Sequence, residues 1–133
     1  MPKTIQQTVR FNVPVAKLFA TYANSKPHSA AIGAPTTVSR TIGAKFSAFN
    51  GMIKGSTLAV IPQRLFVQTW RGGDWKSGVP DSLLFLMFEK KGKGSSLTMI
   101  HANVPDAAYA GIKKGWNSYY WKSWKAYFAK RKK

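Results

Sequence analysis

The chain has 133 residues, of which 44% are hydrophobic and 14% aromatic, and this composition is too apolar for a disordered protein. It carries 21 Lys and Arg against four acidic residues, a formal net charge of +17, and it has no cysteine, which excludes disulfides, thiolate metal ligands and a cysteine nucleophile. The longest uncharged apolar run, residues 83–88, is too short to cross a bilayer, and the N-terminus has no apolar signal segment, so we expect a soluble, cytoplasmic protein. Its length fits a single domain over residues 1–133, in which we expect the basic tail at 130–133 to be frayed.

The first part of the chain is predicted to form one strand followed by two short helices. In residues 5–11 one set of side chains (Ile5, Gln7, Val9 and Phe11), apolar except for Gln7, alternates with a polar set (Gln6, Thr8 and Arg10), which is the period of a half-buried strand. Pro14 suits the first turn of a helix, and apolar residues recur at helical spacing over residues 15–22. A second short helix can begin at Ser25 and is expected to end at Gly33.

From Thr36 onward the sequence predicts an antiparallel meander of about six closely spaced strands. The clearest turn signal is Asn50–Gly51, because a two-residue type I′ turn needs positive φ at both central positions. The strand at residues 82–90 is apolar on both faces, which indicates a central or doubly covered position in the sheet. The segments named as strands are 45–49, 52–60, 64–71, 82–90 and 95–102.

The C-terminal quarter is predicted to be one long, aromatic-rich helix. It can begin near Pro105, with Asn103 as its cap and Asp106 in the first turn, where a negative charge complements the helix dipole. Trp121 and Phe128 are expected on the side opposite the sheet. At about 100° per residue, the stripe that should face the sheet consists of Tyr109, Ile112, Trp116, Tyr119, Tyr120, Ser123 and Tyr127.

The order of these elements predicts the fold class. A strand, two short helices, a run of strands and one long helix bury their apolar faces when a curved antiparallel sheet wraps around the terminal helix, an α+β architecture in two layers. Gly111 and Gly115 each cost about 1 kcal/mol of helix propensity relative to alanine. Their place at the edge of the buried stripe suggests that backbone or a large ring passes close by.

Short motifs occur in a characteristic order from about Thr4 to Lys125. They are Gly43–Phe46, Asn50–Gly51, Gly55, Ile61–Pro62, Val67–Arg71, Trp75, Val104–Pro105 and Gly115–Trp121. In this order and spacing they resemble the C-terminal domain of the activator of the ninety-kilodalton heat-shock protein ATPase, a branch of the START-like (SRPBCC), helix-grip superfamily. The resemblance implies a helix-grip fold with an apolar cavity between the sheet and the terminal helix.

Acid–base catalysis has few candidate residues in this chain. Its carboxylates are Asp74, Asp81, Glu89 and Asp106, and its histidines are His28 and His101. His28 is expected in an exposed helical turn and His101 at the surface or a pore rim, and no pair has a metal-ligand spacing. An enzyme of the cyclase type, with Asp81, Glu89 or His101 as general base, is an alternative that rests on fold analogy alone. We expect a binding protein with no catalytic residue, metal or cofactor.

A small hydrophobic or lipid-like ligand in the cavity is the first functional hypothesis. Ordinary core packing is the competing interpretation for each candidate lining residue. These candidates are Phe46, Met52, Trp70, Phe85, Met87, Met99, Trp116, Tyr120 and Tyr127.

A protein partner is the second hypothesis. Lys114, Trp121 and Lys125 lie on the predicted outer face of the terminal helix and form a candidate surface for a heat-shock chaperone, whose ATPase would be stimulated, or for another acidic protein. The competing interpretation is a ring lying flat under neighbouring lysine stems.

Nonspecific nucleic-acid binding through the basic surface is the third hypothesis. Eight of the 21 residues from 113 to 133 are basic and none is acidic, and basic residues near aromatic rings are what single-strand binders use. Against this, most of those rings are needed in the core and no nucleic-acid motif is present.

Overall fold

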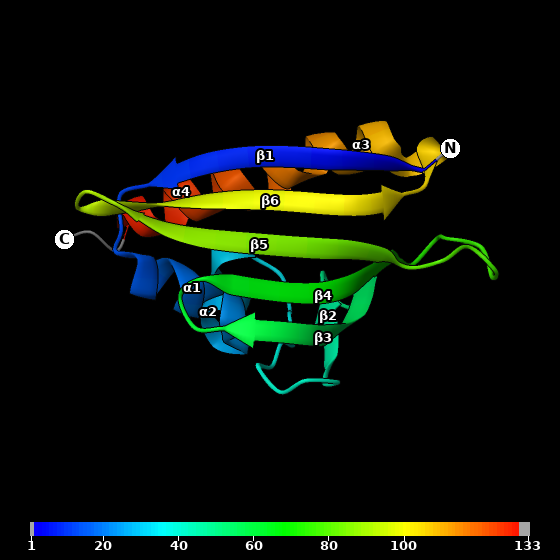
Figure 1. Ribbon diagram of the computed structural model, residues 1–133, viewed down its shortest axis with the longest axis horizontal. Helices are drawn as coiled ribbons and strands as arrows, with labels where there is room; N and C mark the ends of the chain where they lie inside the picture. Colours follow the sequence, from blue (N-terminus) through cyan, green and yellow to red (C-terminus); the bar gives the residue numbers. More distant parts are fainter. Residues whose placement is uncertain (1, 131–133) are drawn as a thin grey trace.

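In the computed structural model, residues 2–130 are described, and their strands form one six-stranded antiparallel sheet with the helices on one face (Figure 1). The strands are β1 (Lys3–Phe11), β2 (Lys45–Ala48), β3 (Ile53–Ile61), β4 (Leu65–Gly72), β5 (Ser82–Lys91) and β6 (Gly94–Val104). The helical elements are α1 (Val15–Ala23), α2 (Ser25–Ile32), the 3-10 turn η1 (Asp106–Ala108), α3 (Tyr109–Gly115), the π-helical segment η2 (Trp116–Trp121) and α4 (Lys122–Lys130). The predicted α+β architecture is confirmed.

The strand order is β1-β6-β5-β4-β3-β2, so β2 to β6 form a meander and β1 returns beside β6. Within the described residues, five strands follow the two short helices rather than about six. The sequence around Thr37 contributes only an isolated bridge to Ser47, because the chain there runs along the edge of β2 without continuous pairing. The Asn50–Gly51 turn has the predicted geometry, with φ of 57° and 92° and the Met52 amide donating to the Phe49 carbonyl at 3.3 Å.

The two short helices begin and end close to where the sequence predicts. α1 follows Pro14, and Gly33 caps α2 in the left-handed conformation at φ 72°. Leu18, Phe19 and Tyr22 of α1 are buried, and α1 lies against β5 and β6 of the sheet. α2 lies against α1 and α4, so the two short helices and the terminal helix share one face of the sheet (Figure 1).

The outer face of the sheet corrects one part of the prediction. β5 is central, but within residues 2–130 no helix packs on its outer side (Figure 1). Leu84 and Leu86 are fully buried toward the helices, so the alternation of a strand places Phe85 and Met87 on the outer face, where both are half-buried. The expectation that Phe85 and Met87 face the terminal helix is therefore wrong.

The terminal helix begins differently from the prediction. Pro105 precedes η1, and no side chain caps its amides. Asn103 has φ 61° and its side-chain amide donates to the Asp81 carbonyl at 3.2 Å, so Asn103 ties β6 to the start of β5 instead of capping the helix. Asp106 lies in the first turn as predicted and pairs with Lys3 at 3.2 Å.

The π-helical segment η2 changes which face of the terminal helix is buried. The Lys122 amide bonds to the Asn117 carbonyl five residues back, so this turn contains more residues than an α-helical turn. As a result the buried rings are Trp116, Tyr120, Trp121, Trp124 and Phe128, whereas Tyr119 is 62% exposed and Tyr127 half-buried. The predictions that Tyr119 is buried and that Trp121 and Phe128 lie outside are wrong, because they assumed a constant 100° per residue.

Candidate functional site

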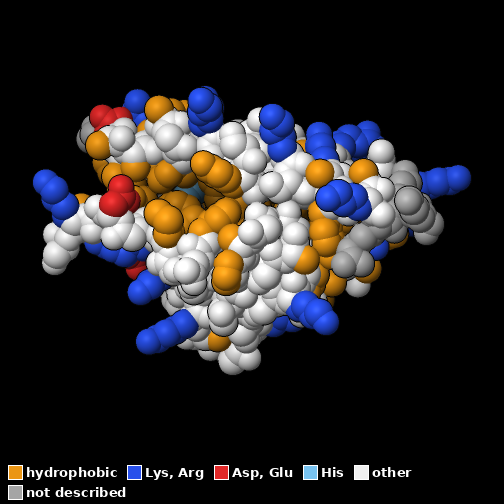
Figure 2. Space-filling model, turned by 180° about the vertical axis from the view of Figure 1, so that it is seen from behind, with side chains coloured by type: hydrophobic (Ala, Val, Ile, Leu, Met, Phe, Trp, Pro, Cys, Tyr) orange, Lys and Arg blue, Asp and Glu red, His pale blue; other side chains and the backbone are white. Residues whose placement is uncertain are grey.

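An open apolar groove lies between the N-terminal half of the terminal helix and the β2–β3 hairpin, and we call it the helix–hairpin groove. Its wide outer part has a volume of about 610 Å3 and its narrow inner part, under Trp116 and Tyr120, about 180 Å3. Figure 2 shows the hollow, with hydrophobic side chains gathered around it. The outer volume falls in the range of small-molecule sites in proteins.

Two glycines and an isoleucine form the helix wall of the groove. Gly111, Ile112 and Gly115 of α3 line its inner part. A Cβ built on Gly111 would meet no atom within 4 Å, and one on Gly115 would contact only the Tyr119 ring, at 3.5 Å. The predicted close approach of backbone or a ring therefore holds for Gly115 and is wrong for Gly111, beside which the space is empty.

The hairpin turn forms the opposite wall. The tight Asn50–Gly51 turn holds Phe49 and Met52 at the groove, and the Phe49 ring meets the Tyr119 ring across it at 5.8 Å, edge to face. Met52 is 68% exposed. Apolar side chains thus remain in contact with solvent on both sides of the opening.

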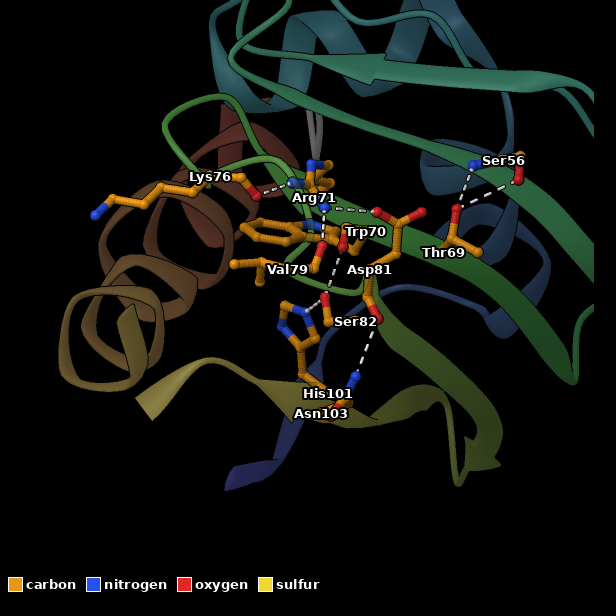
Figure 3. A network of polar contacts seen from close by, with 10 residues as sticks. All are labelled: Ser56, Thr69, Trp70, Arg71, Lys76, Val79, Asp81, Ser82, His101 and Asn103. Carbon is orange, nitrogen blue, oxygen red and sulfur yellow. Dashed lines mark hydrogen bonds and ion pairs between the residues drawn. The ribbon is translucent and has the colours of Figure 1, made fainter. Parts of the chain in front are cut away.

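The β4–β5 loop closes one end of the groove. Trp75 packs on Trp70 with ring centroids 5.7 Å apart, and it can do so only because residue 72 is glycine, since a Cβ there would lie 2.6 Å from the Trp75 indole nitrogen. Arg71 fixes the loop from the other side (Figure 3). Its guanidinium donates to the Val79 carbonyl, to the Lys76 carbonyl at 2.6 Å and to Asp81 at 3.2 Å.

A buried chain of hydrogen bonds lies beneath the groove (Figure 3). The Trp116 indole nitrogen can only donate, so His101 Nδ1 accepts from it at 3.1 Å and Nε2–H donates to Ser82 at 2.7 Å. The Ser82 hydroxyl in turn donates to the Trp70 carbonyl at 2.7 Å. Burial lowers the pKa of His101 to about 3, so the imidazole is neutral at pH 7.

A second buried network joins α2 to the terminal helix. His28 Nδ1–H donates to the Tyr22 carbonyl at 2.8 Å, which leaves Nε2 to accept from the Tyr120 hydroxyl at 2.7 Å. Burial lowers the pKa of His28 to about 4, although its bond to the Tyr22 carbonyl opposes this, and burial raises the pKa of Tyr120. The Tyr22 hydroxyl donates to Gln68 at 2.5 Å.

The histidine placements correct the sequence prediction. His28 and His101 are both fully buried, so neither lies in an exposed turn or at a surface rim. Both nitrogens of each ring are already hydrogen-bonded, and Asp81 and Glu89 are paired with Arg71 and Lys91. None of these groups is therefore placed as a free general base. Among the described residues, no group of three or more His, Cys, Asp or Glu could hold a metal ion.

The candidate ligand-lining residues divide into three groups. Trp70 lines both parts of the groove, Met52 its outer part, and Trp116 and Tyr120 its inner part. Phe46 and Met99 are buried in the core, and Tyr127 packs on Phe128, away from the groove lining. Phe85 and Met87 lie on the outer face of the sheet. The residues of the first group line the groove in the structure, and their contact with a ligand remains a prediction.

Two of the three residues proposed for a partner surface, Lys114 and Lys125, are exposed in the structure. The third, Trp121, is only 4% exposed, and its indole nitrogen donates to Gln7 at 2.7 Å. The prediction that Trp121 belongs to an outer surface is therefore wrong, because η2 rotates its ring toward β1.

Several groove residues were missed by the sequence reasoning. The sequence pattern does not indicate that Phe49, Ile53 and Asp74 lie at a site. Their places at the groove depend on how the hairpin and the β4–β5 loop fold back over the helix. For Gly111 the sequence does contain a signal, because a glycine inside a helix lowers helix stability relative to alanine.

Three comparisons place the chain among known proteins. The sequence profile of the family described as "Activator of Hsp90 ATPase homolog 1-like protein" matches residues 12–129. The chain is 25% identical over 115 residues to an activator of 90 kDa heat shock protein ATPase homolog from Dictyostelium discoideum, covering 86% of this chain and 30% of that protein. It is 29% identical over 101 residues to an uncharacterized protein of Schizosaccharomyces pombe, covering 76% of this chain and again 30% of the relative. The chain thus spans about 30% of the length of these curated relatives.

Solved structures share the fold. A crystal structure of an HSP90 activator from Plasmodium falciparum has a TM-score of 0.88 at 21% identity, covering 95% of this chain and 96% of that one. The solution structure of the Aha1 dimer from Colwellia psychrerythraea has a TM-score of 0.75 at 12% identity, covering 88% and 90%. The predicted START-like, helix-grip fold is confirmed by these likenesses. In residues 2–130, no helix has the length and apolar character needed to span a membrane.

Proposed function

The chain belongs to the activator of Hsp90 ATPase homolog 1-like family, and we propose that its helix–hairpin groove binds a small apolar ligand. The observation that carries the proposal is the groove itself, an open space of about 610 Å3 with aromatic and aliphatic walls. Met52 and Tyr119, at 68% and 62% exposure, leave apolar surface in water on both sides of its opening. A ligand that covers this surface would gain roughly 25 cal/mol for each Å2 of apolar area removed from water.

The glycine at position 111 supports the same proposal. Glycine inside a helix costs about 1 kcal/mol relative to alanine, and no neighbouring atom requires it here. The absence of a side chain leaves the groove open where Gly111 borders both of its parts. The stability given up at this position is therefore consistent with a function for the empty space.

Binding rather than catalysis fits the polar groups near the groove. The His101–Ser82–Trp70 chain is closed, since each donor has an acceptor, and it holds the groove floor rigid. A rigid floor lowers the entropy cost of binding a ligand.

Fluorescence titration with the uncharged probe N-phenyl-1-naphthylamine tests the proposal. We expect saturable binding to the native chain and at least a tenfold loss of affinity in Gly111→Leu, because Gly111 borders both parts of the groove and the space beside it is empty. The melting temperature of Gly111→Leu should equal or exceed that of the native chain, because leucine is the better helix former.

Gly111→Ala is the matched control. It adds the same propensity gain with a single methyl group, so probe affinity should change by less than about threefold. No saturable signal with the native chain, or equal affinity in native and Gly111→Leu proteins, would argue against the groove as the binding site.

Stimulation of a heat-shock chaperone ATPase is a second candidate function, supported by the family membership and by the name of the Dictyostelium relative. The exposed Lys114 and Lys125 supply positive charge that would suit an acidic partner surface. The ATPase rate of the organism's own chaperone should rise on adding the chain and rise less with Lys114→Glu/Lys125→Glu. An unchanged rate together with no co-purification would sink this candidate.

A further inference from the structure

The helix–hairpin groove has a single charged side chain among the residues that line it, and that side chain is negative. Asp74, in the loop after β4, borders the outer part of the groove, where the other lining residues are apolar or glycine apart from the Tyr119 hydroxyl. Figure 2 shows a red acidic side chain at the edge of the hollow. In a chain of net charge +17, a negative charge at the opening of an apolar site is the exception.

Asp74 also differs from the other acidic residues in its pairing. Asp81, Glu89 and Asp106 each form an ion pair, with Arg71, Lys91 and Lys3. Within residues 2–130, Asp74 has no ion pair, although the chain offers 21 Lys and Arg. The fold thus pairs three of its four carboxylates and leaves the one at the groove available.

Arg71, whose guanidinium lies over the Trp75 ring, is already engaged. Its guanidinium lies 5.9 Å from the centre of the Trp75 ring and is held by Asp81 and by the Lys76 and Val79 carbonyls (Figure 3). These contacts stabilise the loop, and among residues 2–130 Arg71 forms its ion pair with Asp81 and not with Asp74.

Two indole rings stand beside the carboxylate. Trp70 and Trp75 both line the outer groove with ring centroids 5.7 Å apart at an interplanar angle of 53°, and we call this place the Trp70–Trp75 corner. The Asp74 carboxylate is close to the same point, since one of its oxygens would lie 3.2 Å from a Cβ on Gly72 and the Trp75 nitrogen 2.6 Å from it. Aromatic faces next to a carboxylate are the recognition chemistry of quaternary ammonium groups.

We propose that the ligand of the groove carries a positively charged alkylammonium group, which lies against Asp74 and the Trp70–Trp75 corner while its apolar part fills the groove. This inference rests on the proposed function of the groove and adds the charge of the ligand. The overall positive charge of the protein opposes a cation at long range, but at 0.15 M salt the Debye length is about 8 Å, so the contact with Asp74 outweighs distant lysines.

Competition against bound N-phenyl-1-naphthylamine in 0.15 M NaCl tests the inference. The competitors are dodecyltrimethylammonium and dodecanoate, both below their micellar concentrations, which share the chain length and differ in head-group charge. We expect the native chain to bind dodecyltrimethylammonium at least tenfold more tightly than dodecanoate. In Asp74→Asn the affinity for dodecyltrimethylammonium should fall about tenfold relative to the affinity of the same variant for the uncharged probe.

Glu89→Gln is the matched control, because it also removes one negative charge but does so far from the groove. The loop that holds Asp74 leads into β5 at Ser82, and Glu89 lies seven residues further along that strand. The control substitution should leave all three affinities unchanged. Equal or tighter binding of dodecanoate, or equal loss of ammonium affinity in Asp74→Asn and Glu89→Gln, would overturn the inference while the proposed function stands. No saturable binding of the uncharged probe to the native chain would overturn both.

Discussion

At the scale of single residues, the two histidines hold the terminal helix in place. His28 accepts a hydrogen bond from Tyr120 and His101 accepts one from Trp116, so both bonds end on rings of η2. A protonated imidazole cannot accept these bonds, and a buried positive charge is costly. Both effects favour the neutral rings that the depressed pKa values indicate.

The histidines should make the protein acid-sensitive. In the folded state the pKa is about 4 for His28 and about 3 for His101, against about 6.5 in the unfolded chain. The unfolded chain therefore binds more protons below pH 6.5, and the free energy of unfolding should fall as the pH drops from 6.5 toward 4. For each histidine the loss approaches about 1.4 kcal/mol per pH unit only well below pH 6.5, so the two together lose roughly 4 kcal/mol between pH 6.5 and 4.5.

Urea unfolding at pH 7.0, 5.5 and 4.5 measures this loss. The variants His28→Gln and His101→Gln should each be less stable at pH 7 but should each remove about half of the pH dependence. A slope that is the same in both variants as in the native chain would assign the acid sensitivity to other groups. The burial of these rings was not predictable from the sequence, because it depends on the contacts of α2 and β6 with the terminal helix.

At the scale of elements, the π-helical segment η2 sets the position of the terminal helix. Trp116, Tyr120, Trp124 and Phe128 recur every four residues and are all buried. In a regular α-helix of 3.6 residues per turn, such a series drifts by about 40° at each step and leaves the core. The wider turn of η2 compensates for this drift, and the bonds of Trp116, Tyr120 and Trp121 to His101, His28 and Gln7 hold it.

Deletion of Ser118 tests this role of η2. Ser118 is exposed, so its loss removes no buried contact, and a regular helix over the shortened segment keeps Trp124 and Phe128 within about 20° of Trp116. The deletion should therefore retain a cooperative thermal transition, and Ser118→Ala should melt within a few degrees of the native chain. Insertion of one alanine after Ser118 should instead turn Trp124 and Phe128 away from the core by about 100° and abolish the transition, because each buried aromatic ring lost from a core costs about 3–5 kcal/mol. Loss of the cooperative transition in the deletion, or a native transition in the insertion, would contradict the phase-correcting role.

Most elements could be predicted from the sequence because their signals are local. The alternation in β1, the Asn50–Gly51 turn and the Gly33 cap depend on neighbouring residues and lie where expected. The phase of the terminal helix after Trp116 could not be predicted, because η2 depends on bonds to Gln7, His28 and His101, far away in the sequence. The errors at Tyr119, Trp121 and Phe128 follow from this one segment.

At the scale of the whole molecule, charge contributes little to the fold. The ion pairs seen among residues 2–130 lie at the surface, where such pairs contribute about 0–1 kcal/mol each. The core is instead aromatic, with Trp124 fully buried among Phe11, Tyr22 and Phe128. The rings of the basic C-terminal region that nucleic-acid stacking would need are mostly in this core. Residues 131–133 of the basic tail, including their expected fraying, lie outside the described residues.

The location of the groove could be predicted only in part. A space between sheet and terminal helix follows from the order of elements, and Met52, Trp70, Trp116 and Tyr120 line it. The hairpin and the β4–β5 loop bring in Phe49, Asp74 and Trp75, and the folding of these loops over the helix depends on Gly72 and on the Arg71 bonds.

Mapping of backbone amide chemical shifts during titration with N-phenyl-1-naphthylamine tests the central claim most directly, since a 14.7 kDa chain suits this measurement. If the helix–hairpin groove is the binding site, the amides that shift should belong to residues 49–53, 72–75 and 111–120. Amides of the β5–β6 turn, around Gly92, should not shift. Shifts confined to the outer face of the sheet around Phe85 and Ile100, or to the region of Arg10 and Phe128, would contradict the claim.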